Sequence, residues 1–194
     1  GQQEAPRPRV ETKDGLNAMA YDLRNDDVLI HSNLTSYMAR SKKVKPLFEW
    51  FKETDQWFEE RNIPMILTIV AEGIDIYPEW VRYIKERQHR YTIQLHCHEH
   101  INFRHILDED KIYDLIMPAK EKVEETFGVP VTRWFAPFSK SGFPGGTAEI
   151  GMRVCERMGL KFHTKGNGPI PHRYFHYWSP KSVAKIKQVI ENHV

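Results

Sequence analysis

Short apolar runs alternate along this chain with longer segments of helical periodicity. Six runs are too short for helices and are rich in β-branched or aromatic residues, which is typical of strands: 28–30, 64–71, 91–95, 133–138, 160–162 and 174–178. Between them, apolar residues recur at three- and four-residue spacing, as over 46–61 and 107–127. This alternation predicts an α/β fold, with a parallel sheet or barrel inside and helices outside.

Proline and serine residues mark where several of these helices begin. Pro46 opens the helix over 46–61, and Pro78 lies in the first turn of another helix. Ser179 followed by Pro180 has the pattern of an N-cap and a first helical residue. We expect Pro118 to kink or divide the helix over 107–127, because proline removes an intrahelical hydrogen bond.

The composition is that of one globular domain. The chain has 194 residues, 40% of them hydrophobic and 12% aromatic. Residues 1–20 are rich in charge, proline and glycine without a regular period, so we expect an extended arm followed by a single domain over 21–194. No apolar run approaches the length of a membrane span, so we expect a soluble protein, either cytoplasmic or secreted after signal removal.

The charge balance and the cysteine count narrow the function further. Lys and Arg number 28 against 26 Asp and Glu, and without a long basic run this argues against a nucleic-acid partner. Cys97 and Cys155 are too few for a disulfide framework and do not form a CxxC motif. Two free thiols are the simpler interpretation. The sequence does not indicate an oligomeric state.

Candidate metal-binding and catalytic residues cluster after the run at 91–95, in the segment His96-Cys97-His98-Glu99-His100. The end of a buried strand is where open α/β sheets and barrels carry their active sites. His96 and His100 can converge on one metal ion if the chain turns between them, and imidazole suits zinc. A solvated histidine-rich loop without a ligand is the alternative.

The order of these segments resembles the polysaccharide deacetylases of the NodB-homology group, carbohydrate esterase family 4. The resemblance covers Asp26 to the C-terminus and rests on the His96-x-x-x-His100 step, the aromatic strand that ends in Pro137-Phe138, and the Phe175-His176 step. It implies a distorted (β/α) barrel and a divalent metal, usually zinc, held by one Asp and two His. The implied reaction is removal of N-acetyl groups from a glycan, with His176 as the acid. From the residues alone, His176 could equally be a core histidine.

The first strand departs from the family pattern, in which it ends in an Asp-Asp pair that supplies the base and the third ligand. With a strand at 28–30, the matching positions are Ser32 and Asn33. Asp26-Asp27 would then precede the strand and lie at its opposite end, roughly 17 Å away. We therefore expect the amide oxygen of Asn33 to complete the metal site, and Ser32 to lie where the catalytic base normally does.

The family's Arg-x-Pro motif is also altered, because this chain reads Phe135-Ala136-Pro137. Arg133 lies two residues upstream, on the same face of a strand, and could replace the missing arginine. Glu72, which follows the run at 64–71, is the main candidate for a replacement base, and Glu99 is the other. A solvated loop carboxylate is the alternative for each.

Two functions follow from this pattern. One is a metal-dependent hydrolase that removes N-acetyl or related acyl groups from a carbohydrate, with His96, His100 and Asn33 on the metal. The other is a catalytically degenerate relative of the deacetylases that serves as a carbohydrate-binding or structural module.

Overall fold

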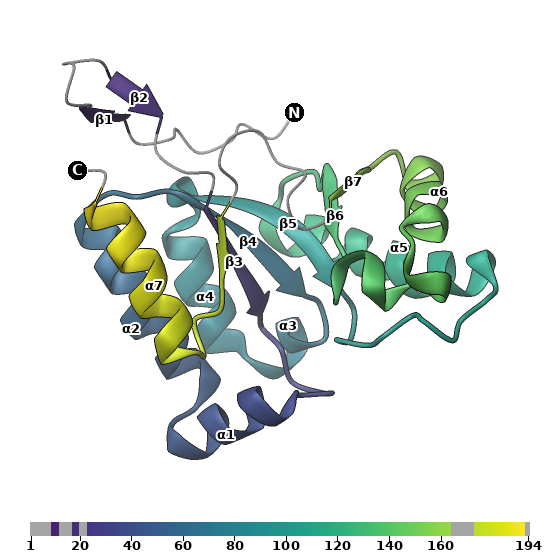
Figure 1. The fold of residues 1–194 in the computed structure, drawn as a ribbon, viewed down its shortest axis with the longest axis horizontal. Helices are drawn as coiled ribbons and strands as arrows, with labels where there is room; N and C mark the ends of the chain where they lie inside the picture. The colour runs from purple at the N-terminus through teal and green to yellow at the C-terminus, as the bar shows by residue number, and fades with distance from the viewer. Residues whose placement is uncertain (1–8, 12–16, 20–22, 164–172, 193–194) are drawn as a thin grey trace.

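The computed structural model describes residues 9–11, 17–19, 23–163 and 173–192, and its main feature is a six-stranded sheet (Figure 1). The sheet is parallel throughout, with the order β7-β6-β5-β4-β3-β8. Its strands are β3 (Leu23–Val28), β4 (Met65–Val70), β5 (Tyr91–Cys97), β6 (Arg133–Phe135), β7 (Lys161–His163) and β8 (Arg173–Phe175). All carboxyl ends therefore meet at one edge, where a site can be assembled from several strands.

Helices surround this curled half-barrel. They are α1 (Ser36–Val44), α2 (Leu47–Glu60), α3 (Gly73–Ile76), α4 (Pro78–Glu86), α5 (Glu109–Phe127), α6 (Glu149–Met158) and α7 (Pro180–Glu191). In Figure 1, α2, α4 and α7 lie at the β3–β8 end of the sheet, and α5 and α6 lie at the β6–β7 end. The predicted α/β class and distorted (β/α) barrel are confirmed. No helix in the described ranges has the length and apolar character needed to cross a bilayer.

The central strands are covered on both faces. Every residue of β4 and of β5 is buried, which explains why their sequences read as nearly continuous apolar runs. Between the sheet and α2 and α4, the rings of Phe51, Trp80 and Tyr177 pack edge to face or tilted, with centroids 5.5 to 5.8 Å apart. This aromatic layer is the core under the β3–β4 half of the sheet.

Most helix boundaries agree with the prolines and caps in the sequence. Pro46 precedes α2, Pro78 begins α4, and the Ser179 side chain caps α7 by accepting the N–H of Ser182. The prediction that Pro118 divides its helix is wrong, because α5 runs uninterrupted over 19 residues. Its buried apolar stripe packs along the whole length, and this packing outweighs one missing hydrogen bond.

The predicted first strand is wrong by several residues. β3 ends at Val28, and the buried residues Leu29 and Ile30 follow it outside the sheet. The pairing with β4 shifts register between Asn25 and Val28, and Asp27 has a φ of 61°, so the strand bulges there. Asp26 and Asp27 consequently lie at the carboxyl end of β3, the end that the 28–30 assignment excluded.

The first 20 residues are described only at 9–11 and 17–19. These form β1 (Arg9–Glu11) and β2 (Asn17–Met19), which pair with each other in antiparallel fashion. An extended arm followed by one domain remains a prediction.

Candidate metal centre

Asp27, His96 and His100 meet in a buried cluster at the carboxyl edge of the sheet. Asp27 comes from the end of β3, His96 from the end of β5, and His100 from the loop that follows. The three residues are 3%, 4% and 6% exposed, and the candidate ligand atoms all lie within 4.8 Å of one another. Oδ1 of Asp27 is 3.1 Å from Nε2 of His96 and 3.2 Å from Nε2 of His100. One carboxylate oxygen thus faces two imidazole nitrogens.

The tautomer of His96 follows from the contact that its Nδ1 atom makes. Nδ1 lies 2.5 Å from the carbonyl oxygen of Phe135, which can only accept, so Nδ1 carries a proton. Nε2 of the neutral ring then offers a lone pair toward the Asp27 oxygen, and two acceptors would face each other. A proton or a metal cation between them resolves this conflict. An imidazole oriented through its outer N–H is the usual arrangement of a metal-binding histidine.

The second oxygen of Asp27 is held from the end of the chain. Oδ2 accepts the indole N–H of Trp178 at 2.9 Å and lies 3.4 Å from Nδ1 of His176. The Tyr177 hydroxyl donates to the backbone carbonyl of Asp27 at 2.6 Å. These contacts leave Oδ1 as the oxygen directed at His96 and His100.

Electrostatics couples these groups. Burial alone would raise the pKa of Asp27, but hydrogen bonds with His100, His176 and His96 hold that pKa well below its ordinary value. Burial would lower the pKa of His96, and the hydrogen bond with Asp27 raises it instead. The pKa of His176 is raised for the same reasons. The Asp27 carboxylate is therefore the negative centre that makes the cluster attractive to cations.

Asp26 lies beside this cluster with partners of its own. Nε and Nη2 of Arg24 lie 2.8 and 3.0 Å from its two carboxylate oxygens, and the Thr68 hydroxyl donates to Oδ1 at 3.0 Å. Burial opposes ionisation, but the guanidinium of Arg24 lowers the pKa of Asp26. The Arg24 guanidinium lies between two rings, 4.6 Å from the centroid of Phe135 and 5.3 Å from that of Tyr174. Asp26 is thus an ionised, firmly oriented carboxylate.

His176 is the most accessible member of this group, with 30% of its side chain exposed. Its ring stacks on Trp178 with centroids 4.7 Å apart and an interplanar angle of 18°. Tyr174 contacts the His176 ring edge to face, and the backbone N–H of His176 donates to the Ser182 hydroxyl. A ring held in this way can reach a molecule bound at the cluster.

Several solved structures have the same architecture. BA3943 from Bacillus anthracis, a pseudoenzyme of carbohydrate esterase family 4, matches with a TM-score of 0.57 and 11% identity over 89% of this chain and 59% of its own. The polysaccharide deacetylase Bc1974 from Bacillus cereus matches with a TM-score of 0.56 and 14% identity, covering 88% of this chain and 85% of that one. This chain has the family 4 fold.

A further structure with this fold is the peptidoglycan deacetylase PdaC from Bacillus subtilis, with a TM-score of 0.53 and 11% identity over 89% of this chain and 81% of that one. This chain spans about three fifths of the length of BA3943. No protein-family model and no curated protein sequence matches it. At these identities the comparison establishes the family 4 fold, and the chemistry has to be argued from the residues.

The predicted third ligand, Asn33, is exposed, and its amide donates to Glu99 at 3.3 Å. Oε1 of Glu72, the predicted replacement base, accepts the backbone N–H groups of His31 at 3.0 Å and Ser32 at 2.5 Å. Ser32, Asn33 and Glu72 therefore organise the loop after β3, because that strand ends at Val28 instead of Ile30.

The predicted replacement for the missing arginine is also corrected. Asp26 receives its guanidinium from Arg24, while the guanidinium of Arg133 lies 5.6 Å from the ring of Phe135. Arg24 and Asp26 are two residues apart on β3, so their side chains share a face of the strand. The signal that could have found both was the Arg-x-Asp-Asp sequence at 24–27, read as a polar strand. Trp178 carried no comparable signal.

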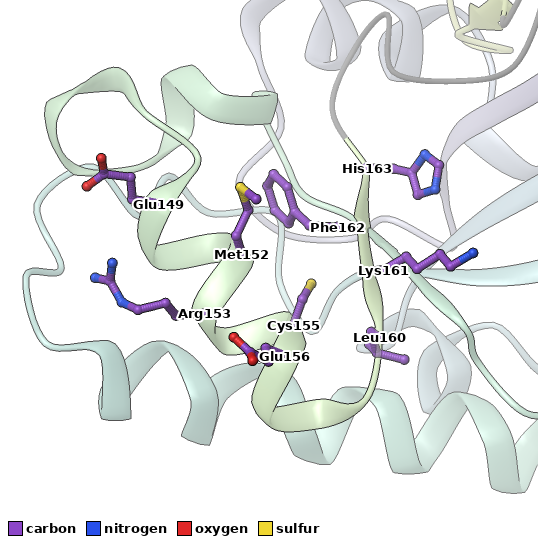
Figure 2. Close-up of a pocket in the computed structure, with 9 residues that line it drawn as sticks. All are labelled: Glu149, Met152, Arg153, Cys155, Glu156, Leu160, Lys161, Phe162 and His163. Carbon is purple, nitrogen blue, oxygen red and sulfur yellow. The ribbon is translucent and has the colours of Figure 1, made fainter.

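A separate pocket lies between α6 and the edge strand β7 (Figure 2). It is lined by residues such as Met152, Cys155 and Phe162 and contains no member of the Asp27 cluster. Burial raises the pKa of the Cys155 thiol to about 12, so this cysteine is not a reactive nucleophile. Cys97 is likewise a buried free thiol with a raised pKa. Neither thiol belongs to a catalytic arrangement.

Proposed function

We propose that this chain is a metal-dependent hydrolase that removes N-acetyl or related acyl groups from a carbohydrate. The observation that carries the proposal is the single oxygen of Asp27 facing the Nε2 atoms of both His96 and His100. The family 4 fold, shared with a polysaccharide deacetylase and a peptidoglycan deacetylase, supports a glycan substrate.

The residues present fit a divalent cation, most simply zinc. Two imidazoles and one carboxylate are the donor set of catalytic zinc sites, which keep further positions open. The proton on Nδ1 of His96, fixed by the Phe135 carbonyl, leaves Nε2 free to act as a ligand. When bound, the ion would supply Lewis acidity to the acyl carbonyl and to a water molecule.

The protein's own groups move the protons. Asp26, ionised and held by Arg24 and Thr68, accepts a proton from the attacking water. The water oxygen bonds to the acyl carbon, and the carbon–nitrogen bond then breaks. His176 donates a proton to the leaving nitrogen, so the sugar keeps a free amine and the acyl group leaves as a carboxylate.

The alternative of a degenerate module loses its main support. It depended on Ser32 and Asn33 replacing the Asp-Asp pair, whereas β3 carries Asp26 and Asp27 at its carboxyl end. The arginine that was thought to be missing is supplied by Arg24. Both groups needed for water activation are therefore represented, and the hydrolase is the function that we favour.

The test combines metal content with acetate release from N-acetylated chitin oligomers. Purified protein should contain about one equivalent of metal, and His100→Ala should lose both metal and activity. Asp26→Asn should keep its metal but lose activity by about a hundredfold or more, because the general base is gone. Glu99→Gln, a carboxylate change in the same histidine loop, should retain both. A parent protein that binds no divalent metal, or an Asp26→Asn variant as active as the parent, would overturn the proposal.

A further inference from the structure

Positive charge is concentrated on two helices of this nearly neutral chain. α1 carries Arg40, Lys42 and Lys43 and no acidic residue, and α7 carries three lysines and one glutamate. Together these 21 residues have a net charge of +5, whereas the whole chain has +2, which leaves −3 for the remainder. The asymmetry is local and gives the molecule one basic side.

Both helices follow, in the chain, segments that contribute to the metal centre. α1 follows the loop that leaves β3 after Asp27, and α7 begins two residues after Trp178. The Ser41 hydroxyl of α1 donates to the backbone carbonyl of Trp178 at 2.7 Å, which ties α1 to the start of α7. In Figure 1, α1 lies directly beneath the first turns of α7. The two positively charged helices therefore adjoin each other and are connected to segments that build the site.

Five of these basic side chains form what we call the basic face: Arg40, Lys42, Lys43, Lys181 and Lys185. All five are exposed, and none forms an ion pair with another residue in the described ranges. Lys45 is excluded because it pairs with Glu53, and Lys187 because it lies over the ring of Trp57. Unpaired like charges on two adjoining helices repel one another, and an anionic partner would relieve that repulsion.

An exposed aromatic ring contacts one residue of the basic face. Tyr37, in the first turn of α1, is 65% exposed, and the Arg40 guanidinium lies 4.6 Å from its ring centroid. With 65% of the residue exposed, the ring can contact the apolar C–H face of a sugar. Exposed tyrosine rings provide contact area at low entropic cost. A surface that combines such a ring with cations suits a sugar polymer that carries negative charge.

We infer that the basic face binds an anionic stretch, carrying carboxylate or phosphate groups, of the glycan whose acyl group reaches the metal centre. This inference rests on the proposed function, because a surface that starts beside a carbohydrate site is best placed for the same polymer. A glycan is favoured over a nucleic acid because the proposed metal centre acts on a glycan, and a single-stranded oligonucleotide tests the alternative. The face thereby selects among glycans by charge.

Direct binding measurements test the inference without requiring catalysis. The probes are polygalacturonate for carboxylates, phosphorylated dextran for phosphates, and unmodified dextran as the neutral control. One or both charged polymers should bind at low ionic strength, and the binding should weaken steeply as salt is added. Replacing Lys42, Lys43 and Lys181 by Gln should weaken binding by about tenfold or more, because three favourable charge interactions are lost.

The matched control replaces three exposed lysines elsewhere in the chain, Lys85, Lys111 and Lys161, by Gln. It removes the same total charge and should leave binding unchanged. Glutamine has nearly the same helix propensity as lysine, and Lys161, the one residue of the six that lies in a strand, is exposed on β7, so neither triple variant should disturb folding. Equal losses in the two triple variants, equal binding of unmodified dextran, or tighter binding of a single-stranded oligonucleotide would overturn the inference.

His100→Ala separates this inference from the proposed function. The variant should lose metal and acetate release but keep its affinity for the charged polymer, because His100 is not part of the basic face. If the parent protein binds the charged polymer but releases no acetate from the N-acetylated chitin oligomers, the proposed function fails, and of the inference only the binding of an anionic glycan stands. If acetate release is found while the basic face contributes nothing to binding, the inference fails alone.

Discussion

The indole N–H of Trp178 donates a 2.9 Å hydrogen bond to Oδ2 of Asp27, 151 residues away in the chain. The neighbouring Tyr177 hydroxyl donates to the Asp27 backbone carbonyl. The segment after β8 therefore fixes both the side chain and the main chain of the central carboxylate. With Oδ2 occupied, Oδ1 is the oxygen presented to His96 and His100. The carboxylate is oriented before any metal arrives.

Removing that indole hydrogen bond should weaken metal binding. Trp178→Phe keeps an aromatic ring to stack on His176 but cannot donate to Asp27. We expect zinc affinity to fall by about 10- to 100-fold, the usual effect of losing a hydrogen-bond partner of a metal ligand. Competition with a chromophoric chelator measures this directly. Trp57→Phe, on α2, is the matched control and should bind zinc like the parent; unchanged affinity in Trp178→Phe would contradict the assigned role.

The role of the Arg24–Asp26 ion pair can be tested by moving the positive charge to another position. Arg24→Leu leaves a buried carboxylate without its cation, so it should reduce the free energy of unfolding by about 3–5 kcal/mol and abolish acetate release. Phe135 lies 4.6 Å from the Arg24 guanidinium, close enough for an arginine at 135 to reach Asp26. Arg24→Leu combined with Phe135→Arg should recover part of both quantities. Recovery of stability without activity would indicate a structural role alone for the guanidinium.

The sequence predicted most elements because their burial is periodic. Apolar patterns, together with proline or serine signals, correctly predict β4, β5, α2, α4 and α7. The sequence pattern did not predict β3 correctly, and the reason is physical. This strand carries four buried polar residues, Arg24, Asn25, Asp26 and Asp27, where strand preferences favour apolar residues. A strand that builds a site breaks the local rules that identify strands.

The apolar residues that follow β3 also favoured the wrong strand assignment at 28–30. Leu29 and Ile30 are fully buried, as a strand would require, but they pack beyond the bulge, where Leu29 has a φ of 69°. A positive φ at a leucine is held by tertiary contacts and leaves no mark in the sequence. The Trp178–Asp27 contact is likewise a product of the strand order β3-β8, which the sequence alone does not fix.

Gly73 packs closely against the backbone of Leu29, in the segment that follows β3. A Cβ at this position would lie 1.9 Å from the backbone oxygen of Leu29, so a side chain cannot be accommodated without moving backbone. Gly73→Ala should therefore displace the loop after β3 and reduce the free energy of unfolding by about 1–3 kcal/mol or more. Urea denaturation measures the loss. Gly128→Ala is the control, because a Cβ there meets nothing within 4 Å and only its φ of 67° costs about 1 kcal/mol. Equal losses at the two positions would show that the contact with Leu29 is not limiting.

Asp55 anchors a second buried polar network, at the amino end of β5 and so at the opposite end of that strand from His96. Its carboxylate accepts both Nη atoms of Arg90, at 3.0 and 3.1 Å, and the hydroxyls of Tyr83 and Tyr91, at 2.9 and 2.6 Å. Burial and the adjacent Asp55 charge both raise the pKa of each tyrosine, which keeps the hydroxyls protonated as donors.

Asp55→Ala should separate stability from metal binding. It leaves the buried Arg90 guanidinium with only the partly exposed Glu59, 3.2 Å away, and the Tyr83 and Tyr91 hydroxyls without their acceptor. The free energy of unfolding should therefore fall by about 3–5 kcal/mol. Asp75→Ala removes a partner of Lys122 at the exposed surface and should cost about 0–1 kcal/mol. Zinc affinity, measured where the folded state still dominates, should be unchanged in both variants, because neither residue touches the Asp27 cluster. A weakened zinc affinity in Asp55→Ala would instead mean that the two ends of the sheet are energetically coupled.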